Sequence, residues 1–190
     1  MTAPFALAVA FLLAFFVLEG RFRQDAAARS VARTAADRGT VRQIGGAFAI
    51  AGVTFVLSPL LVDGGIAVLP DAVRWAGVAL AIAGLVTRLW SATILGRFYS
   101  RTVALASEHR LVRAGPYRFV RHPGYAGAIC LWIGAGLAGG SGIATAAIAL
   151  VTVLAYHRRI RVEEEFLRDA FGAEYVAYAK TTHRLVPFVY

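Results

Sequence analysis

Cysteine and charge are both scarce in this chain of 190 residues. Cys130 is the only cysteine, which excludes a disulfide framework, a CxxC pair and a thiolate metal site. Because it lies in an apolar run, we interpret Cys130 as a small buried hydrophobic residue. Charged residues make up 16% of the chain and hydrophobic residues 58%, whereas soluble domains carry about 25% charged residues. The composition therefore predicts a membrane protein.

Lysine is almost absent, since Lys180 is the only lysine and the formal net charge of +9 comes from arginine. The arginines alternate with long apolar spans instead of forming one continuous patch, so we expect no nucleic-acid partner. His109, His157 and His183 have no partner at metal-ligand spacing, so we also expect no metal site. Composition rich in Arg and Ala but poor in Lys indicates a GC-rich bacterial genome.

Five apolar stretches predict transmembrane helices, because a bilayer core of about 30 Å needs roughly 17 to 25 apolar helical residues. No Lys or Arg precedes the first stretch, so we expect it to be retained and not cleaved as a signal peptide. That stretch is short, and Glu19 at its end is expected to snorkel to the membrane surface. The turn-rich residues 138–142 predict a tight hairpin between the last two stretches. The five stretches are Pro4–Leu18, Ile44–Val62, Val73–Leu95, Gly124–Leu137 and Ile143–His157.

Arginine distinguishes the two sides of the membrane. Residues 20–43 and 96–122 each contain six arginines, whereas the connections at residues 63–71 and 139–142 contain none. The positive-inside rule therefore places the two Arg-rich loops and the basic C-terminal tail in the cytoplasm, with the N-terminus outside. In a bacterium this is a multi-pass protein of the inner membrane.

Three local elements are predicted outside the spans. Residues 158–182 are expected to form a helical cytoplasmic tail with a break near Gly172, and residues 29–40 are expected to form a surface helix on anionic headgroups. Residues 102–112 contain two short β-prone pieces that predict a small hairpin. The sequence thus predicts an all-α integral membrane protein with five transmembrane helices.

A cationic cluster next to a helix start is predicted in residues 115–125. The Gly-Pro pair at its beginning favours a turn, and Pro123 suits the first position of a helix, with His122 as its N-cap. Arg118 and Arg121 then lie with His122 beside the free N–H groups of that helix end. This arrangement suits a carboxylate or a phosphate. The alternative is that both arginines only anchor the helix to lipid headgroups.

Three successive carboxylates occur in residues 159–167, directly after the last span and against the local excess of positive charge. On a helix Arg159 and Glu163 are four residues apart and face the same way. We interpret Glu165 as part of a solvated face, and Glu163 and Glu164 as functional residues.

The two segments together are complementary to S-adenosylmethionine, which has a carboxylate, an ammonium, a sulfonium, a ribose diol and a flat adenine. A site for it needs a cationic pocket, carboxylates for the diol and the ammonium, and aromatic or apolar walls. The chain offers the cations Arg118, Arg121 and His122, the carboxylates Glu163 and Glu164, and the walls Tyr117, Tyr125 and Phe166.

Several motifs follow one another along the C-terminal half. They are Gly115-Pro116-Tyr117-Arg118, Arg121-His122-Pro123 with Tyr125 and Gly127, Arg159-Ile160 with Glu163, Glu164 and Leu167, Phe171-Gly172 with Tyr175 and Tyr178, and Arg184-Leu185-Val186-Pro187. In this order they resemble the signature of the isoprenylcysteine carboxyl methyltransferase family and its phospholipid methyltransferase relatives. The resemblance extends from about Arg88 to Pro187, and nothing specific precedes it.

This resemblance implies one membrane methyltransferase domain over residues 1–190, with S-adenosylmethionine as the cofactor. Three N-terminal spans occupy residues 1–95, and the cofactor-binding loop, the helical hairpin and the tail occupy residues 96–190. The implied cofactor-binding residues are Gly115, Tyr117, Arg118, His122, Pro123, Tyr125, Glu163 and Glu164. The catalytic candidates are Arg88, Arg121, Arg159 and Glu163.

The methyl acceptor is expected to be a lipid-like or isoprenoid molecule reached from the bilayer. A carboxylate acceptor, as the family name implies, is already ionised at pH 7, and Arg88, Arg121 or Arg159 could hold it. Arg88 lies inside the third span, where an ionisable residue is a functional candidate that could also snorkel to the interface. An amine or hydroxyl acceptor would need a base, for which His122 or one of the Glu pair is available.

Two alternatives remain. Membrane sterol reductases share an Arg-His-Pro turn but use NADPH, and they typically have Asn where this chain has Gly124. Their acidic pair leads into a Cys and a Lys-Tyr-Gly run, in place of which this chain has Leu167 and residues 170–172. These differences favour methyl transfer. The other alternative is a non-catalytic lipid-binding membrane protein.

Overall fold

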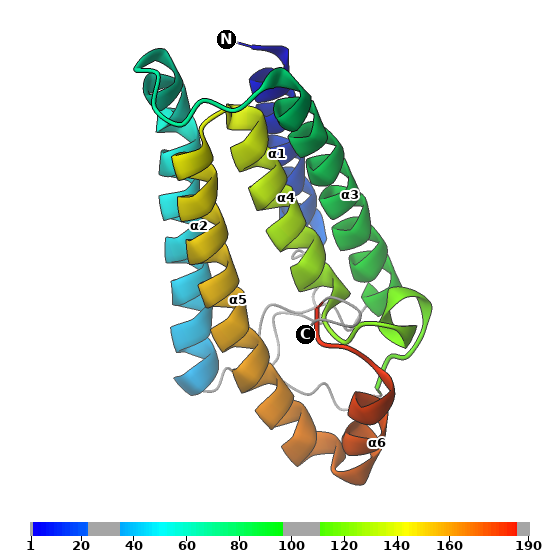
Figure 1. Ribbon diagram of the computed structural model, residues 1–190. Coiled ribbons are helices and arrows are strands. Elements are labelled where there is room, and N and C mark those ends of the chain that lie inside the picture. The colour runs from blue at the N-terminus through cyan, green and yellow to red at the C-terminus, as the bar shows by residue number, and fades with distance from the viewer. Residues whose placement is uncertain (1, 23–34, 97–110, 186–190) are drawn as a thin grey trace.

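The computed structural model describes residues 2–22, 35–96 and 111–185. Five long helices run alongside one another, and the short helix α6 lies beyond one end of the bundle (Figure 1). The expected all-α fold is confirmed. In chain order the described elements are α1 (Ala3–Phe22), α2 (Ala35–Asp63), α3 (Asp71–Leu95), the 3₁₀-helix η3 (Gly115–Arg118), α4 (Pro123–Gly139), α5 (Gly142–Phe171) and α6 (Ala173–Thr181).

Two of the local predictions lie mainly outside the described residues. This applies to residues 102–110 of the expected hairpin and to residues 29–34 of the expected surface helix. Residues 35–40, the rest of that predicted helix, form the first turns of α2.

All five predicted spans are helices, and the chain is a multi-pass membrane protein. Four helices contain stretches long and apolar enough to cross a membrane, namely Ala3–Arg21, Gly39–Asp63, Asp71–Leu95 and Gly142–Phe171. The fifth, α4, is apolar but has only 17 residues, a length of about 25 Å at 1.5 Å per residue. The last helix continues beyond its predicted end at His157 as far as Phe171, so the first part of the expected tail extends a membrane helix.

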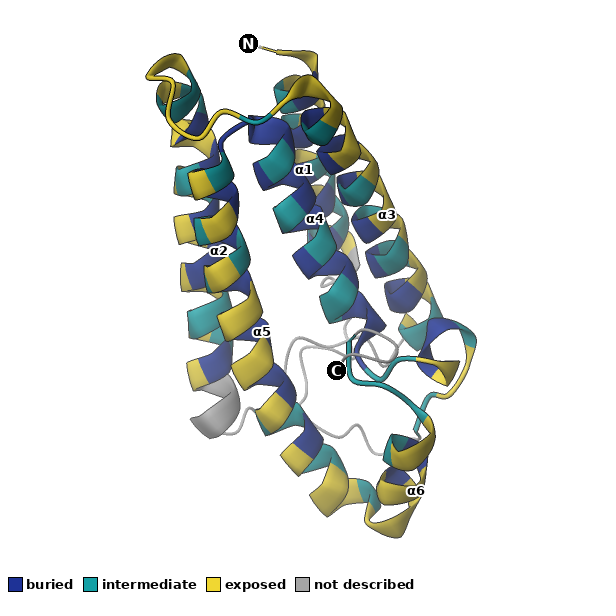
Figure 2. Ribbon diagram, viewed as in Figure 1, coloured by how far each residue is buried: buried dark blue, intermediate teal, exposed yellow. Residues whose placement is uncertain are grey.

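The short helix α4 lies at the centre of the bundle. It contacts α1, α2, α3 and α5, and 12 of its 17 residues are buried. The outer helices carry exposed apolar side chains such as Val56, Leu60 and Leu150. Figure 2 shows exposed residues in yellow on the outer surfaces of α2 and α5. A lipid environment covers such faces. Cys130 on α4 is half-buried, so the expected full burial was wrong.

Glycine allows α3 and α4 to pack closely. Gly77 and Gly84 on α3 face Gly134 and Gly127 on α4, so each helix carries its pair of glycines seven residues apart. A Cβ atom on Gly77 would lie 2.7 Å from the carbonyl oxygen of Gly134, and one on Gly127 would lie 2.6 Å from that of Gly84. Backbones this close gain dispersion contacts, which matter in lipid because apolar burial there provides no drive for helix association.

The turn between α4 and α5 is the expected tight hairpin. Gly140 ends α4 with φ of 89°, and its N–H donates to Leu137 O. Ser141 is the N-cap of α5, and its hydroxyl accepts a hydrogen bond from the N–H of Ala144 at 3.4 Å. Glycine suits this left-handed position because it lacks a Cβ.

A buried ion pair joins α1 to α3. The guanidinium of Arg88 donates to both carboxylate oxygens of Glu19, with Nη2–Oε1 at 3.0 Å, Nη2–Oε2 at 3.1 Å and Nε–Oε2 at 3.3 Å. The two side chains are 9% and 4% exposed. Glu19 therefore does not snorkel as expected, because α1 continues to Phe22 and the carboxylate finds its counter-charge inside the bundle. Pairing lowers the large cost of a charge at membrane depth.

Adding a methyl group at Gly84 is expected to destabilise the bundle. A Cβ there would lie 2.5 Å from the carbonyl oxygen of Gly127, so Gly84→Ala should lose about 1–3 kcal/mol through overpacking. Gly46→Ala is the matched control, since a Cβ at Gly46 meets nothing within 4 Å. Unfolding in detergent titrated with sodium dodecyl sulfate measures both changes. Equal stability of the two variants would contradict the close approach of α3 and α4.

Breaking the Glu19–Arg88 pair from one side is expected to be costly. Glu19→Gln or Arg88→Gln each leaves one buried charge unpaired and should lose about 3–5 kcal/mol. The double variant Glu19→Gln/Arg88→Gln should lose less than the sum, because both charges are gone. A double-mutant cycle in the same unfolding assay gives the coupling energy. Strict additivity would show that the pair does not form.

Candidate functional site

Three segments meet at the end of the bundle next to α6. They are the turn that leads into α4, the second half of α5, and the stretch of chain that follows α6 (Figure 1). Gly172, with φ of 52°, reverses the chain between α5 and α6, as the predicted break requires. The chain after α6 then runs beside the start of α4, joined by an isolated parallel bridge between Val120 and His183.

Backbone hydrogen bonds hold that last stretch in place. Arg121 N–H donates to His183 O at 2.7 Å, His122 N–H donates to Arg184 O at 3.1 Å, and His183 N–H donates to Phe119 O at 3.0 Å. Because these bonds involve the residues next to the helix start, residues 182–185 become one wall of the site.

The turn before α4 has the predicted form. Gly115 has φ of 57° and opens the 3₁₀-helix η3, while His122 is the N-cap and Pro123 the first residue of α4. Tyr117 is buried, and its carbonyl oxygen accepts a hydrogen bond from the Tyr178 hydroxyl at 2.7 Å. Burial raises the pKa of Tyr178 to about 12, so its hydroxyl remains a donor throughout the physiological range.

Basic side chains from all three segments surround the buried carboxylate of Glu164. It is 1% exposed. Its oxygens accept hydrogen bonds from Arg121 Nε at 3.0 Å and Arg184 Nε at 3.0 Å, and from the i+4 residue Arg168 at 3.4 Å. The Nε2 atom of His122 lies 3.5 Å from Oε1. Glu164 thus fixes the positions of these cations with respect to one another.

The neighbouring carboxylate, Glu163, forms a second cluster. Tyr125 donates its hydroxyl proton to Glu163 Oε2 at 2.5 Å. Arg159 Nε lies 3.7 Å from the same oxygen and 3.3 Å from the Tyr125 hydroxyl, so the predicted shared helix face of Arg159 and Glu163 is observed. Arg159 also donates to Thr40 of α2 at 2.7 Å. The Glu163 side chain is 26% exposed, so a ligand can reach it.

Stacked aromatic rings connect the two clusters. The rings of His122 and Tyr125 are parallel within 5° with centroids 5.6 Å apart, and Tyr125 also contacts Tyr156 at 4.9 Å. His122 is 5% exposed, yet its Nε2 makes no hydrogen bond. A buried polar atom without such a bond is unusual in a native structure, and the group nearest to it among the charged side chains is the Glu164 carboxylate, at 3.5 Å.

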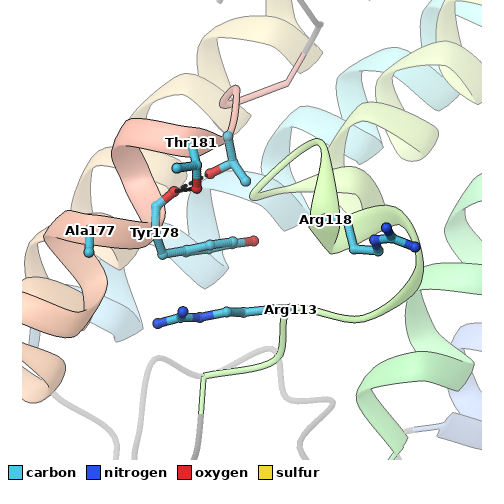
Figure 3. Close-up of a pocket in the computed structure, with 6 residues that line it drawn as sticks. Arg113, Arg118, Ala177, Tyr178 and Thr181 are labelled. Carbon is cyan, nitrogen blue, oxygen red and sulfur yellow. Dashed lines mark hydrogen bonds between the residues drawn. The ribbon is translucent and has the colours of Figure 1, made fainter.

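Some predicted site residues lie elsewhere. Arg88 is paired with Glu19 and packs behind the first turn of α4, where a Cβ on Gly124 would lie 2.9 Å from its Nη1. Arg118 is exposed and lines a separate cavity of about 360 Å³ with Arg113 (Figure 3). Arg88 and Arg118 therefore do not join Arg121, His122 and the Glu pair. Glu165 is exposed, as interpreted.

Sequence reasoning missed several partners of the site. The i+4 spacing of Glu164 and Arg168 could have revealed their pairing. Arg184 comes 20 residues after Glu164, beyond the helix break, and Thr40 lies 119 residues from Arg159. No local periodicity connects such pairs.

The residues at the site fit an adenosyl-methionine ligand. Glu163 is an accessible carboxylate for a diol or an ammonium, His122 has a buried ring nitrogen without a hydrogen bond, and the partly buried Tyr125 ring adds an aromatic surface. Within residues 2–22, 35–96 and 111–185, no group of three or more His, Cys, Asp and Glu side chains could hold a metal ion.

Several known proteins are similar to this chain in sequence. The rice (Oryza sativa subsp. indica) probable protein-S-isoprenylcysteine O-methyltransferase is 34% identical over 119 residues, which cover 62% of each chain. The Saccharomyces cerevisiae protein-S-isoprenylcysteine O-methyltransferase is 33% identical over 115 residues, which cover 60% of this chain and 48% of the yeast protein. This chain thus aligns with less than two thirds of the length of these curated relatives.

A solved structure has the same fold. The eukaryotic intramembrane Ras methyltransferase ICMT (isoprenylcysteine carboxyl methyltransferase) superposes with a TM-score of 0.64 at 25% identity. The match covers 78% of this chain and 53% of that one. Residues 72–174, more than half of the chain, match the profile of the family described as phospholipid methyltransferase. The chain therefore belongs to the phospholipid methyltransferase family, and it resembles the isoprenylcysteine carboxyl methyltransferases in both sequence and fold.

Proposed function

We propose that this protein is an S-adenosylmethionine-dependent methyltransferase that acts on a membrane-embedded, isoprenoid or lipid-like acceptor at a carboxylate. The main support is the pair of adjacent carboxylates on α5, one buried among cations and one accessible beside the His122 and Tyr125 rings. The names of the relatives agree with this activity. The charge bias of the loops supports a site at the cytoplasmic face of a bacterial inner membrane, with the N-terminus outside.

The two carboxylates have different tasks in this proposal. Glu163 contacts the cofactor, since its side chain is accessible, while Glu164 positions Arg121 and His122, because its oxygens already accept hydrogen bonds from arginines. When bound, S-adenosylmethionine supplies a methyl group on a sulfonium. The backbone turn at Gly115 and Tyr117 and the rings of His122 and Tyr125, with Pro123 between them, shape the cofactor pocket and exclude water.

We assign the acceptor carboxylate to Arg159. All three candidate arginines already have partners, Arg88 in Glu19, Arg121 in Glu164 and Arg159 in Tyr125 and Thr40. Position therefore decides between them. Arg159 lies beside the accessible Glu163, on a helix whose outer face meets lipid. A carboxylate is ionised at pH 7 and needs no general base. The chain's contribution is then alignment of the acceptor, exclusion of water and placement of charge.

The cofactor assignment predicts selective stabilisation in detergent. S-adenosylhomocysteine at 100 times its Kd should stabilise the protein by about 2.7 kcal/mol, and NADPH should not stabilise it. Glu163→Gln and His122→Ala should abolish the effect while the protein stays folded. Glu165→Gln removes the adjacent exposed carboxylate and should change nothing. Stabilisation by NADPH alone would favour a reductase, and no stabilisation by any of these ligands would favour a non-catalytic membrane protein.

The acceptor assignment predicts a base-labile product. With a labelled methyl donor, a small isoprenoid acid such as N-acetyl-S-farnesylcysteine or an acid in membrane lipid extracts should gain a methyl ester, which alkali hydrolyses to methanol. Arg159→Met should lower kcat/KM by about 100-fold or more and retain stabilisation by S-adenosylhomocysteine. Arg158→Gln, an exposed neighbour, serves as the control. A methyl product that resists alkali would show an amine or hydroxyl acceptor and overturn the carboxylate assignment.

A further inference from the structure

A cavity of about 360 Å³ lies between η3 and α6, apart from the two carboxylate clusters (Figure 3). Two arginines, Arg113 and Arg118, come from the segment that leads into α4, and the opposite wall belongs to α6 and the residue after it. Neither Glu163 nor Glu164 lines it. The lining residues are Arg113, Arg118, Ala177, Tyr178, Thr181 and Thr182.

One of the two cations in this cavity is held in a fixed orientation. The guanidinium of Arg113 lies over the Tyr178 ring, 5.6 Å from its centroid, as Figure 3 shows. Its Nη2 contacts Glu174 Oε1 at 3.0 Å. The ring itself is fixed by the hydrogen bond from its hydroxyl to Tyr117 O. A guanidinium stacked in this way loses little further freedom when it binds an anion.

The other cation is available for a ligand. Arg118 is exposed and forms no hydrogen bond or ion pair within the described parts of the chain, and its guanidinium lies 5.8 Å from the centroid of the Phe119 ring. Arg113 and Arg118 thus supply two cations to the lining, with side chains that extend in opposite directions (Figure 3), against one carboxylate, that of Glu174. Arginine forms strong charge-assisted hydrogen bonds with phosphate oxygens.

Hydroxyl groups complete the lining. Thr181 and Thr182 both donate to the carbonyl oxygen of Tyr178, at 3.0 and 2.8 Å. Thr182 Oγ1 also accepts a bond from Arg121 Nη1 at 3.4 Å, so this residue is shared with the Glu164 cluster. The lone pairs of Thr181 Oγ1 are left to accept hydrogen bonds, which suits the hydroxyl groups of a polar headgroup.

Apolar side chains next to the cavity point to a membrane source for the ligand. Phe119, adjacent to Arg118, is 63% exposed, and Val176, adjacent to Ala177, is 45% exposed. Basic and apolar side chains together at the end of a membrane helix bundle are typical of contact with the headgroup region. We propose that this cavity binds the phosphate of an anionic lipid headgroup, separately from the methyl-transfer site.

Binding of dioctanoyl phosphatidylglycerol to the full chain in neutral detergent tests the proposal, with native mass spectrometry or thermal stabilisation as the readout. Arg118→Gln and Arg113→Gln should each weaken apparent affinity by about tenfold. Glu174→Gln removes the competing carboxylate and should strengthen it. Arg158→Gln, which removes an exposed arginine on α5, should leave affinity unchanged.

Four outcomes would overturn the proposal. Equal weakening by Arg158→Gln would indicate general attraction to an anionic surface, and unchanged affinity in Arg118→Gln would exclude the cavity. Binding of inorganic phosphate or glycerol 3-phosphate as tight as that of the lipid would identify a soluble phosphate ligand. Loss of stabilisation by S-adenosylhomocysteine in Arg118→Gln, with lipid binding intact, would return Arg118 to the cofactor site.

Discussion

The carboxylate of Glu164 holds together parts of the chain that would otherwise repel one another. Arg121, Arg168, Arg184 and His122 come from the turn before α4, from α5 and from the stretch after α6, and they meet around this one buried acid. Without it, several cations would be confined in a poorly solvated space, where like charges interact strongly. The geometry of the whole site, including the ring stack of His122 on Tyr125, depends on this single negative charge.

The membrane helices fix the position of the start of α4, which carries part of the site. The start of α4 carries the site, and its position is fixed by the close glycine contacts with α3 and by the Arg88 guanidinium packed against Gly124. Because Arg88 is in turn bound to Glu19, α1 also contributes to the position of the helix start. The placement of His122 and Tyr125 thus depends on α1 and α3. Neither of these helices carries a residue of the two carboxylate clusters.

Features that depend on local sequence were predictable, and those that depend on distant pairing were not. The lengths of the apolar stretches predicted the five helices, and Pro123 with His122 predicted the start of α4. The i+4 spacing predicted that Arg159 lies beside Glu163. The Glu19–Arg88 pair joins residues 69 positions apart in sequence, and a hydropathy profile contains no information on which buried acid meets which buried base. The sequence also does not predict which groups the Arg118 side chain lies near, because that depends on where α6 packs. The division of the chain into one domain of 190 residues stays a prediction.

The bridge between Val120 and His183 has a consequence for biosynthesis. A chain made from its N-terminus folds in that order, so all five membrane helices precede the residues that close the site. The contact of Arg184 with Glu164 joins a residue beyond these helices to α5. The stretch that completes the site is therefore synthesised after the five helices that support it.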